Sequence, residues 1–529
     1  MKLSQLLSVL GADCSREADI TALTCDSREV VPGALFVAVE GAKDDGRAYI
    51  PDALARGAAA VVCRPPLPDG AAGAAVDEPR AALARLAAEF YGHPARELSL
   101  IAVTGTKGKT TTSHMLREIF TAAGYKTGLI GTLGARVGQK LLAESPNTTP
   151  EPIALHRTLR QMADAGCTHV VMEVSSQAMK LHRVDGLTFD AALFLNLTPD
   201  HIGGAEHADF DEYRACKAAL FRQCRLAVGN GDDPNWPAMA AQVPPGVPVL
   251  TFGFGESAQV RGLDAAPDPG RPFAVRLTAE GAAPYHIPMP GTFNAADALA
   301  ASALCRAMGL DDGAVRAGLA HVSVPGRAQL VPVPAPYTVV IDYAHNGDSF
   351  RALMETLRTC RPRRIIAVFG AGGDRPRIRR VEMGRAAARW ADHAVLTTDN
   401  PRSERAEDIC ADIAAAMAGA IPVEIVPDRR EAIFRALDLA EPGDVVALLG
   451  KGHEGYIEEN GVRRPFSERD VVEEYFQKRG EAVSEGAWTG ARVSDGAEGP
   501  RDQPASVGKR PNALTGSQRD NIEARRSGQ

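Results

Sequence analysis

The chain has 529 residues, too many for a single hydrophobic core, so we expect about two to four domains. Its 59 basic and 66 acidic residues give a net charge of −7, which offers no electrostatic basis for nucleic-acid binding. Its nine cysteines form no CxxC pair, so neither a zinc site nor a disulfide framework is expected. No apolar run approaches the roughly 20 residues of a membrane span, and the N-terminal LLSVL is too short for a signal peptide, so we expect a cytoplasmic protein.

Residues 1–97 are typical of a small α/β domain. Apolar strands are expected at 34–39 and 58–63, with a helix at 50–57 between them. The polar signals are the triplet Asp26-Ser27-Arg28 and the segment GAKDDGR at 41–47. Taken alone, both could be solvated loops.

Residues 101–112, IAVTGTKGKTTT, combine an apolar strand, a glycine turn and a helix expected to begin at about Thr111. This order points backbone N–H groups and a helix N-terminus at a phosphate. Lys109 would reach the outer phosphates and contact only ligand, and the Thr110 hydroxyl would hold Mg²⁺. The predicted nucleotide-binding residues of this loop are Gly105, Thr106, Lys107, Gly108, Lys109, Thr110 and Thr111.

From residue 98 to 327, strands and helices alternate as in a mostly parallel sheet with helices on both faces. Glu173 ends the apolar strand 169–173, and His201 follows the strand 191–195. Parallel sheets bind ligands at these strand ends, and a carboxylate beside a phosphate loop can hold Mg²⁺. Lys217 follows on an expected helix at 213–222, where it could equally be an ordinary lysine that buries only its stem.

A turn at 147–150, NTTP, offers hydroxyl and amide donors that suit an anionic sugar-peptide. The same turn could cap a helix from Glu151, and both roles are compatible.

Residues 328–480 predict a Rossmann-like domain with strands at 338–341, 364–369, 394–397 and 445–449. Three of these strands end near Arg375, Arg402 and Glu454, which we expect to face one crevice. Two arginines and a glutamate suit an amino acid with extra carboxylates and an amine. The glycine cluster before Arg375 could equally be a structural turn. Residues 481–529 are rich in Gly, Ser, Ala and mixed charges and are expected to be disordered.

The motifs DSR, GTKGKTT, NTTP, EVSS, DHIG, YAH, GAGGDR, DNPR and GKGHE occur in this order between residues 26 and 454. Together they resemble the Mur ligase family. The resemblance implies a UDP-sugar-binding domain at 1–97, a central ATP-binding domain at 98–327 and an amino-acid-binding domain at 328–480. It implies a monomeric enzyme that uses ATP and Mg²⁺ to join meso-diaminopimelate to the D-glutamate γ-carboxylate of UDP-MurNAc-L-Ala-D-Glu, through an acyl phosphate, in peptidoglycan precursor synthesis.

The resemblance also assigns residues to each ligand. Lys109, Lys217 and His201 would be catalytic, and Lys217 would carry a CO₂-derived carbamate. The Mg²⁺ ligands would be Thr110, Glu173, His201 and the carbamate on Lys217. The further ATP-binding residues would be Asn294, Arg327 and Asp342. The sugar-peptide would meet Ser27, Asn147, Thr148, Thr149, Ser175 and Arg183. Diaminopimelate would meet Arg375, Asp399, Asn400, Pro401, Arg402, Gly450 and Glu454.

Some residues depart from the family pattern: Asp297 stands where an asparagine is usual, Gln177 where many members have histidine, and Pro376 and Arg379 follow the GGDR turn. Folylpolyglutamate synthase shares the phosphate loop but lacks the DSR domain and the DNPR turn. A lysine-adding tripeptide synthetase would differ only in its acceptor pocket. A non-catalytic sensor of cell-wall precursors is a further alternative, and the intact Lys109, Thr110, Glu173, His201 and Lys217 argue against it. Arg402 would read the second carboxylate of diaminopimelate, or it would only brace its turn.

Overall fold

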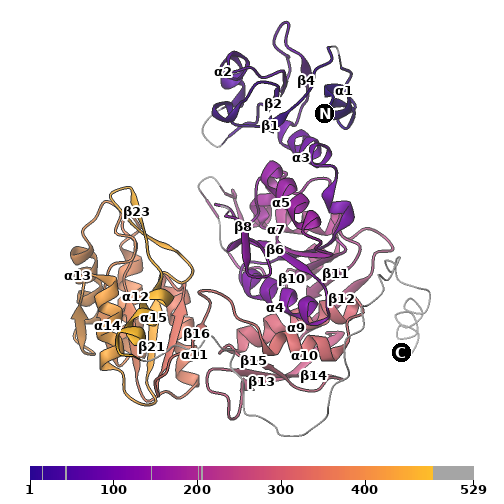
Figure 1. The fold of residues 1–529 in the computed structure, drawn as a ribbon. Coiled ribbons are helices and arrows are strands. Elements are labelled where there is room, and N and C mark those ends of the chain that lie inside the picture. The colour runs from indigo at the N-terminus through magenta and orange to yellow at the C-terminus, as the bar shows by residue number, and fades with distance from the viewer. Residues whose placement is uncertain (15, 42–44, 145, 200–201, 204–205, 481–529) are drawn as a thin grey trace. The chain divides into compact units, whose positions relative to one another are not determined.

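The computed structural model describes residues 1–480 except 15, 42–44, 145, 200–201 and 204–205. The expected disorder of 481–529 and the assignments made to His201 therefore lie outside the described residues. The described strands form sheets of four, eleven and six strands and one two-stranded hairpin. Figure 1 shows helices packed on these sheets. The predicted α/β fold class with mostly parallel sheets is confirmed.

The N-terminal sheet is parallel and has the order β1-β2-β3-β4. Its strands alternate between two small cores, as the pleat of a strand requires. Leu35 and Val37 face the side of α1 and α3, whereas Phe36 faces the side of α2. The elements are α1 Leu3–Ser8, β1 Ala22–Thr24, η1 Ser27–Glu29, β2 Ala34–Val37, α2 Ile50–Ala55, β3 Ala60–Cys63, β4 Gly73–Ala75 and α3 Pro79–Phe90.

The central sheet has the order β15-β14-β13-β12-β11-β10-β5-β9-β6-β7-β8. The strands from β13 to β6 are parallel, and antiparallel pairing begins at β14 on one side and at β7 on the other. The parallel strands are β5 Ser99–Thr104, β6 Thr127–Gly131, β9 His169–Glu173, β10 Ala191–Phe194, β11 Ala227–Asn230 and β12 Val249–Gly253. The edge strands are β7 Gly134–Val137, β8 Lys140–Ala143, β13 Val260–Pro267, β14 Val275–Ala279 and β15 Tyr285–Ile287.

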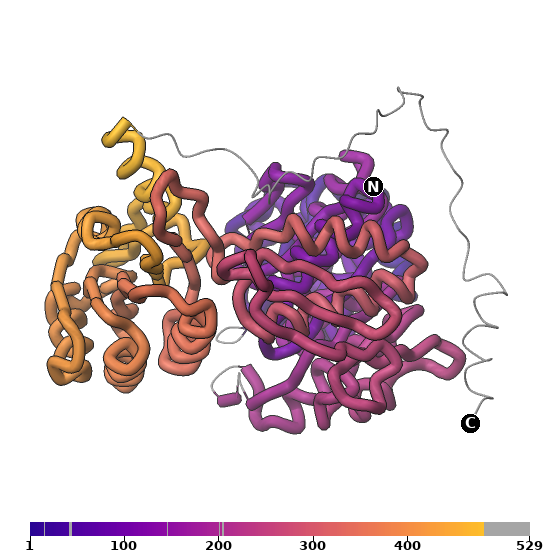
Figure 2. The backbone as a smooth tube through the Cα atoms, turned by 90° about the horizontal axis from the view of Figure 1, so that it is seen from below, coloured from indigo at the N-terminus to yellow at the C-terminus, as the bar shows by residue number. Residues whose placement is uncertain are grey.

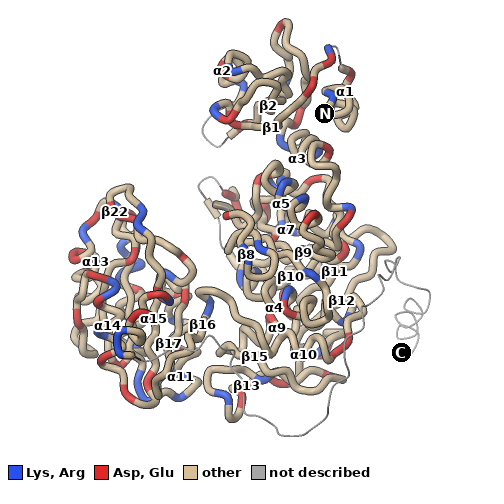
Figure 3. The backbone as a smooth tube through the Cα atoms, viewed as in Figure 1, with Lys and Arg blue, Asp and Glu red and all other residues tan. Residues whose placement is uncertain are grey.

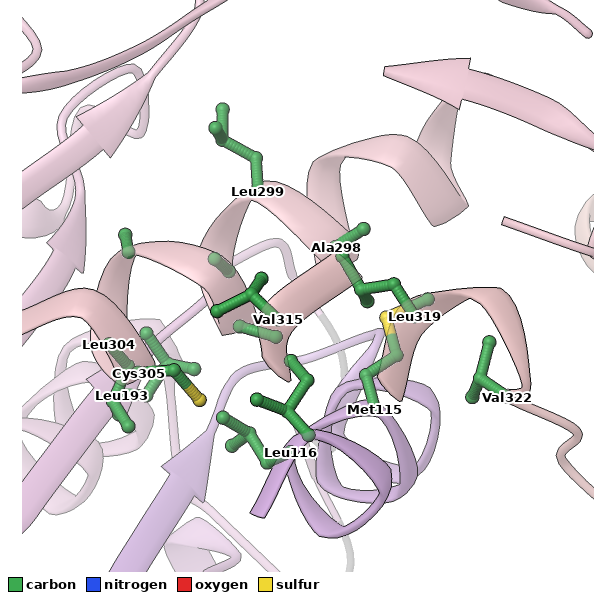
Figure 4. Packing of buried hydrophobic residues seen from close by; sticks show 14 of the residues in the cluster. Met115, Leu116, Leu193, Ala298, Leu299, Leu304, Cys305, Val315, Leu319 and Val322 are labelled. Atoms are coloured by element: carbon green, nitrogen blue, oxygen red, sulfur yellow. The ribbon is translucent and has the colours of Figure 1, made fainter. Parts of the chain in front are cut away.

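Helices cover both faces of the central sheet, and alternate residues of the central strand β5 point to each face. Ile101 and Val103 point to a core formed with α4 Lys109–Ala122, α9 Thr292–Ala307 and α10 Asp312–Ala320. Figure 4 shows this core, in which Met115 and Leu116 of α4 pack toward Val315 and Leu319 of α10. Leu100 and Ala102 point to the opposite core. The helices of that face are α5 Pro152–Asp164, α6 Ser176–Lys180, α7 Phe210–Ala219 and α8 Trp236–Ala240.

The C-terminal sheet has the order β16-β17-β21-β18-β19-β20, and only β16 is antiparallel to its neighbour. Its elements gather into one body in both views of the chain (Figures 1 and 2). Its strands are β16 Gln329–Val331, β17 Thr338–Asp342, β18 Ile365–Phe369, β19 His393–Leu396, β20 Val423–Ile425 and β21 Val445–Leu449. One face packs on α11 Gly347–Thr359, α12 Ile378–Trp390 and α13 Ala406–Met417, the other on α14 Arg429–Leu439 and α15 Glu468–Lys478. The hairpin is β22 Tyr456–Glu459 and β23 Val462–Pro465.

Basic and acidic residues are interspersed along the described chain (Figure 3). Within the described residues, no helix combines the length and the apolar character that crossing a membrane requires.

Two expected helix boundaries were wrong. The helix α4 begins at Lys109 and not at Thr111, because Gly108 adopts φ +83° and lets the chain enter the helix directly from the glycine turn. The helix α7 runs from Phe210 to Ala219 and not over 213–222. It begins earlier because the Asp209 side chain accepts the Glu212 N–H and caps the first turn.

Gly318 of α10 should be required for the packing of α10 on α4. A Cβ at Gly318 would lie 2.4 Å from Ile119 Cα, a backbone atom that cannot rotate away. Although alanine favours a helix over glycine by about 1 kcal/mol, overpacking of a core costs about 1–3 kcal/mol. Gly318→Ala should therefore lower the midpoint of thermal unfolding. The exposed Ala317→Gly in the same helix gives the size of the propensity effect alone. A higher midpoint for Gly318→Ala would contradict this packing.

Candidate functional site

The glycine loop after β5 is fixed by hydrogen bonds to the segment that follows β10. The Lys107 N–H donates to Asn196 Oδ1 at 2.9 Å, and the Thr106 N–H donates to the Asn196 carbonyl at 3.0 Å. The Thr106 hydroxyl accepts the Thr198 N–H at 3.1 Å. Gly108 has no room for a side chain, because a Cβ would meet Asp297 Oδ1 at 2.4 Å. The shape of the loop is therefore fixed by residues 196–198 on one side and by Asp297 on the other.

Lys109, at the start of α4, turns back on the loop. Its Nζ donates to the carbonyls of Gly105 at 2.8 Å and Thr106 at 3.1 Å. The expectation that this side chain contacts only ligand was therefore wrong. The ammonium lies over the loop that would hold the phosphates, where it supplies a positive charge to an anionic ligand.

A buried carboxylate lies beside the loop at the end of β9. Glu173 accepts the Thr110 hydroxyl at 3.1 Å and both the N–H and the hydroxyl of Thr132 at 3.0 and 3.1 Å. Gly131 lets this carboxylate approach, because a Cβ there would lie 2.1 Å from Glu173 Oε1. Burial raises the pKa of Glu173, although Lys109 opposes the shift. A bound cation would stabilise the ionised form.

Lys217 of α7 reaches the same loop from the opposite face of the sheet. It is only 2% exposed, and its Nζ donates to the Gly105 carbonyl at 3.0 Å. The ammonium also lies 4.8 Å from the centroid of the Tyr213 ring, whose hydroxyl is 3.0 Å from Thr106 Oγ1. Lys217 is therefore part of the loop environment and is not a solvent-exposed lysine.

The first turn of α9 offers one unsatisfied polar atom. Asn294 is buried, and its Nδ2 donates to the Pro290 carbonyl at 2.6 Å. Its Oδ1 is buried with no hydrogen-bond partner among the described residues, so it remains able to accept from a ligand. Asp297, one turn on, is buried, and this burial raises the pKa of its carboxyl well above the usual range.

The turn at 147–150 is anchored to the end of β9. The Thr149 hydroxyl donates to the Glu173 carbonyl at 2.9 Å and accepts the Ser175 N–H at 3.1 Å. Arg183 donates to the Thr149 carbonyl at 3.1 Å, and Thr148 Oγ1 lies 3.1 Å from Thr132 Oγ1. The structure thus gathers four of the six residues assigned to the sugar-peptide; Asn147 directly precedes them in the chain. Ser27 is buried in η1 of the N-terminal sheet.

A cavity of about 90 Å³ opens at the carboxyl ends of the C-terminal strands. Six of the seven residues assigned to diaminopimelate line it: Arg375, Asp399, Asn400, Arg402, Gly450 and Glu454. Pro401 does not line it, and its carbonyl instead packs against Gly373, where a Cβ would lie 1.9 Å away. The expectation of one crevice for Arg375, Arg402 and Glu454 is therefore confirmed.

Glu454 is held by three neighbours inside this cavity. It accepts from Lys451 Nζ at 2.8 Å, Asn400 Nδ2 at 2.9 Å and the Tyr343 hydroxyl at 3.2 Å. These contacts lower the pKa of Glu454 although its burial opposes them, so the carboxylate is ionised at neutral pH. It offers a fixed negative charge to an ammonium group.

Arg402 lines the same cavity, and its backbone is strained at φ +52°. Its N–H donates to the Glu458 carbonyl at 3.1 Å, and its carbonyl accepts the Asn460 N–H at 2.7 Å. One guanidinium nitrogen donates to the Gly373 carbonyl at 2.6 Å. The guanidinium therefore braces the GGDR turn, and not its own DNPR turn, and also lines the cavity. Its contact with a second carboxylate stays a prediction.

Two further assigned residues lie where the chain enters the C-terminal sheet. Asp342 accepts the N–H groups of Ala328 and Ala344 at 2.6 and 2.8 Å, and burial raises its pKa. The Arg327 guanidinium lies 5.3 Å from the centroid of the Tyr343 ring. Asp342 thus orders the backbone at this junction, and its contact with a nucleotide stays a prediction.

Several site residues were missed by the sequence analysis. Thr132 follows β6 and carries no motif, although a threonine at the end of a strand neighbouring β9 could have been considered. Tyr213 lies one turn before Lys217 in α7, and its aromatic ring is typical of a core position. Lys451 lies within GKGHE but was not assigned a role, and it is completely buried.

The oxygen donors beside the loop suit a hard divalent cation. The Thr110 hydroxyl and the Glu173 carboxylate are already 3.1 Å apart, and both side chains are oxygen ligands of the type that Mg²⁺ takes. The raised pKa of Glu173 shows that its charge is under-compensated by the protein alone. The residues therefore fit a Mg²⁺ ion.

Glu173→Gln should separate a ligand role from a structural one. Because burial disfavours the ionised carboxylate, the neutral amide should not lower the midpoint of thermal unfolding near neutral pH. Mg²⁺ with ATP should raise the midpoint of the wild-type protein and raise that of the variant much less. Differential scanning fluorimetry measures both, with the exposed Glu280→Gln as a matched control. A lower midpoint for Glu173→Gln without ligand would assign the carboxylate to the fold instead.

Three family models match three successive segments of the chain. Residues 19–91 match the Mur ligase family catalytic domain, residues 103–305 the Mur ligase middle domain, and residues 326–452 the Mur ligase glutamate ligase domain. Two curated relatives are both named UDP-N-acetylmuramoyl-L-alanyl-D-glutamate–2,6-diaminopimelate ligase. The one from Geobacillus thermodenitrificans is 41% identical over 86% of this chain and 95% of its own. The one from Streptomyces avermitilis is 39% identical over 90% and 96%.

Solved structures agree with this grouping. A structure with the same ligase name is 29% identical, covers 91% of this chain and 100% of its own, and has a TM-score of 0.67. A Mycobacterium tuberculosis folylpolyglutamate synthase shares the fold at 21% identity, covering 69% of this chain and 91% of its own with a TM-score of 0.56. With domain matches across the chain and relatives near 40% identity over most of it, the chain belongs to the Mur ligase family.

Proposed function

We propose that the chain is an ATP-dependent, ADP-forming ligase of peptidoglycan precursor synthesis. It joins meso-diaminopimelate to the D-glutamate γ-carboxylate of UDP-MurNAc-L-Ala-D-Glu. The observation that carries the choice of amino acid is the C-terminal cavity, where Arg375 and Arg402 accompany the ionised Glu454. An amino acid with two carboxylates and two amines complements these charges.

Each sheet serves one substrate in this proposal. Residues 1–97 bind the UDP-sugar, with Ser27 as a contact, residues 98–327 bind ATP, and residues 328–480 bind the amino acid. The peptide end of the precursor lies at the cluster of Thr148, Thr149, Ser175 and Arg183, which is anchored to the end of β9. The enzyme acts in the cytoplasm as a monomer.

The phosphate loop supports the first half-reaction. The γ-carboxylate of the precursor attacks the γ-phosphate of ATP, and an acyl phosphate forms as ADP leaves. Mg²⁺, when bound, neutralises charge on the phosphates. Lys109 keeps its ammonium over the loop through the Gly105 and Thr106 carbonyls, where negative charge develops. Asn294 Oδ1 is free to accept from the amino group of adenine.

The C-terminal cavity supports the second half-reaction. Arg402 and Arg375 hold the distal carboxylate, and Glu454 positions an ammonium group. The other amine of diaminopimelate attacks the acyl carbonyl, the tetrahedral intermediate expels phosphate, and an amide bond remains. Exclusion of water protects the acyl phosphate until this attack.

Lys217 is proposed to be carbamylated. Its neutral amine adds to CO₂, a nitrogen–carbon bond forms, and one proton is released to solvent. The product is an anion at the position that now holds an amine 3.0 Å from the Gly105 carbonyl. The carbamate, Thr110, Glu173 and His201 would together hold Mg²⁺.

The decisive test is a phosphate-release assay with the precursor and either diaminopimelate or L-lysine at equal concentration. Lysine leaves the Arg402 charge without its anion, and breaking such a pair costs about 2–5 kcal/mol. Efficiency with diaminopimelate should exceed that with lysine by roughly 30-fold to several-thousand-fold. Arg402→Ala should remove most of this preference and change the Michaelis constant for ATP little.

The exposed Arg385→Ala on α12 is a matched control and should keep the preference. Equal use of lysine by the wild-type enzyme would overturn the substrate assignment. Binding of precursor without phosphate release from any amino acid would favour the sensor.

Lys217→Ala should lose ligation by at least about 100-fold, because the proposed anion near the phosphates is removed. Added short carboxylates should restore part of the activity by replacing the carbamate. A ¹³C NMR signal from ¹³CO₂ bound to the wild-type protein should be absent in the variant. An unmodified Lys217 ammonium in a high-resolution structure with ATP and Mg²⁺ bound would refute carbamylation.

A further inference from the structure

A second cluster of metal-ligating side chains lies on α7, outside the residues assigned to any substrate. His207 Nδ1, a Glu212 carboxylate oxygen and Cys216 Sγ all lie within 4.8 Å of one another. Glu212 and Cys216 are four residues apart and therefore share one face of the helix. His207 lies three residues before the first residue of the helix and is only 1% exposed.

The imidazole of His207 is oriented into this cluster. Its Nε2 lies 2.9 Å from Ser176 Oγ, and donation of the Nε2–H to that hydroxyl leaves the lone pair on Nδ1. Nδ1 is buried without a hydrogen-bond partner among the described residues. It faces Glu212 Oε2 at 3.8 Å, too far for a hydrogen bond but suitable for two ligands of one ion.

Two neighbouring groups fix the position of the Glu212 carboxylate. Its Oε1 pairs with Lys180 Nζ at 2.8 Å, and its Oε2 accepts the Ala208 N–H at 2.6 Å. Each carboxylate oxygen has two lone pairs, so Oε2 can keep this bond and bind an ion. Such outer contacts are typical of metal ligands. The positive charge of Lys180 lies nearby and opposes a cation, so the donor set must supply the affinity.

We propose that His207, Glu212 and Cys216 form a binding site for Zn²⁺ with a fourth position open to water. Imidazole nitrogen, carboxylate oxygen and thiolate sulfur are the three ligand types of zinc sites. Zinc–ligand bonds of about 2.0–2.3 Å place ligand atoms roughly 3.3–3.8 Å apart in a tetrahedron. Ligand atoms within 4.8 Å of one another reach this geometry by a shift of about 1 Å. The thiol proton of Cys216 is released to solvent. The ion would fix His207 against the helix that carries Lys217.

The test uses the full chain with excess Mg²⁺ and without ATP, so that oxygen-rich sites hold Mg²⁺. Zn²⁺ is titrated against a chromophoric chelator, and Co²⁺ serves as a spectroscopic substitute. We expect one Zn²⁺ site of higher affinity than any Mg²⁺ site and a sulfur-to-cobalt charge-transfer band in the near ultraviolet. Cys216→Ala should abolish the band and weaken Zn²⁺ binding more than about 10-fold.

Glu212→Gln removes the negative charge with little change of shape and should weaken Zn²⁺ binding. The sulfur-to-cobalt band should persist in this variant, but weaker or shifted. Cys14→Ala, at a cysteine of similar exposure between α1 and β1, is the matched control and should leave both signals unchanged. A band that persists in Cys216→Ala, or equal Zn²⁺ affinity in all four proteins, would overturn the site. None of these measurements depends on the ligase activity, so failure of the site and failure of the proposed function are distinguishable.

Discussion

The charge of one buried carboxylate constrains the centre of the structure. Glu173 ends β9 between Thr110 of the phosphate loop and Thr132 after β6, so a single side chain joins three neighbouring strands. Its approach requires a residue without a Cβ at position 131. The protein leaves this charge partly uncompensated, because hydroxyl and amide donors do not replace a cation. The sheet therefore places a partly uncompensated negative charge beside the site where phosphates would lie.

In the C-terminal cavity, unlike at Glu173, the buried charges are largely balanced by neighbouring side chains. Buried Lys451 pairs with Glu454, and Asn400 contacts both of them. A buried ion pair adds little net stability, but removing one partner is costly. We therefore explain the Lys451–Glu454 pair by its effect on orientation. It keeps the Glu454 carboxylate directed into the cavity, while Arg375 and Arg402 remain in the lining for an anion.

The sequence predicted the fold class and most strand ends because buried parallel strands are continuous apolar runs, as in β9 and β21. It did not predict the edge strands β7–β8 and β13–β15, which are partly exposed and lack such runs. The motif residues of the site were found from their order. Thr132 and Lys451 were not assigned, because their roles arise from contacts between strands that are distant in the chain. The contacts of Lys109 with its own loop were also not predictable from spacing.

The strained backbone at Arg402 affects how a substitution at this position would change the stability of the protein. A non-glycine residue at φ +52° carries strain of about 1–3 kcal/mol, which persists because the flanking N–H and carbonyl are tied to the β22–β23 hairpin. Glycine would relax this backbone, so a chain with glycine at position 402 should unfold at a higher temperature than one with alanine. Arginine offsets part of this strain, because its guanidinium donates to the Gly373 carbonyl and so ties two loops of the cavity together, a bond that neither glycine nor alanine could make.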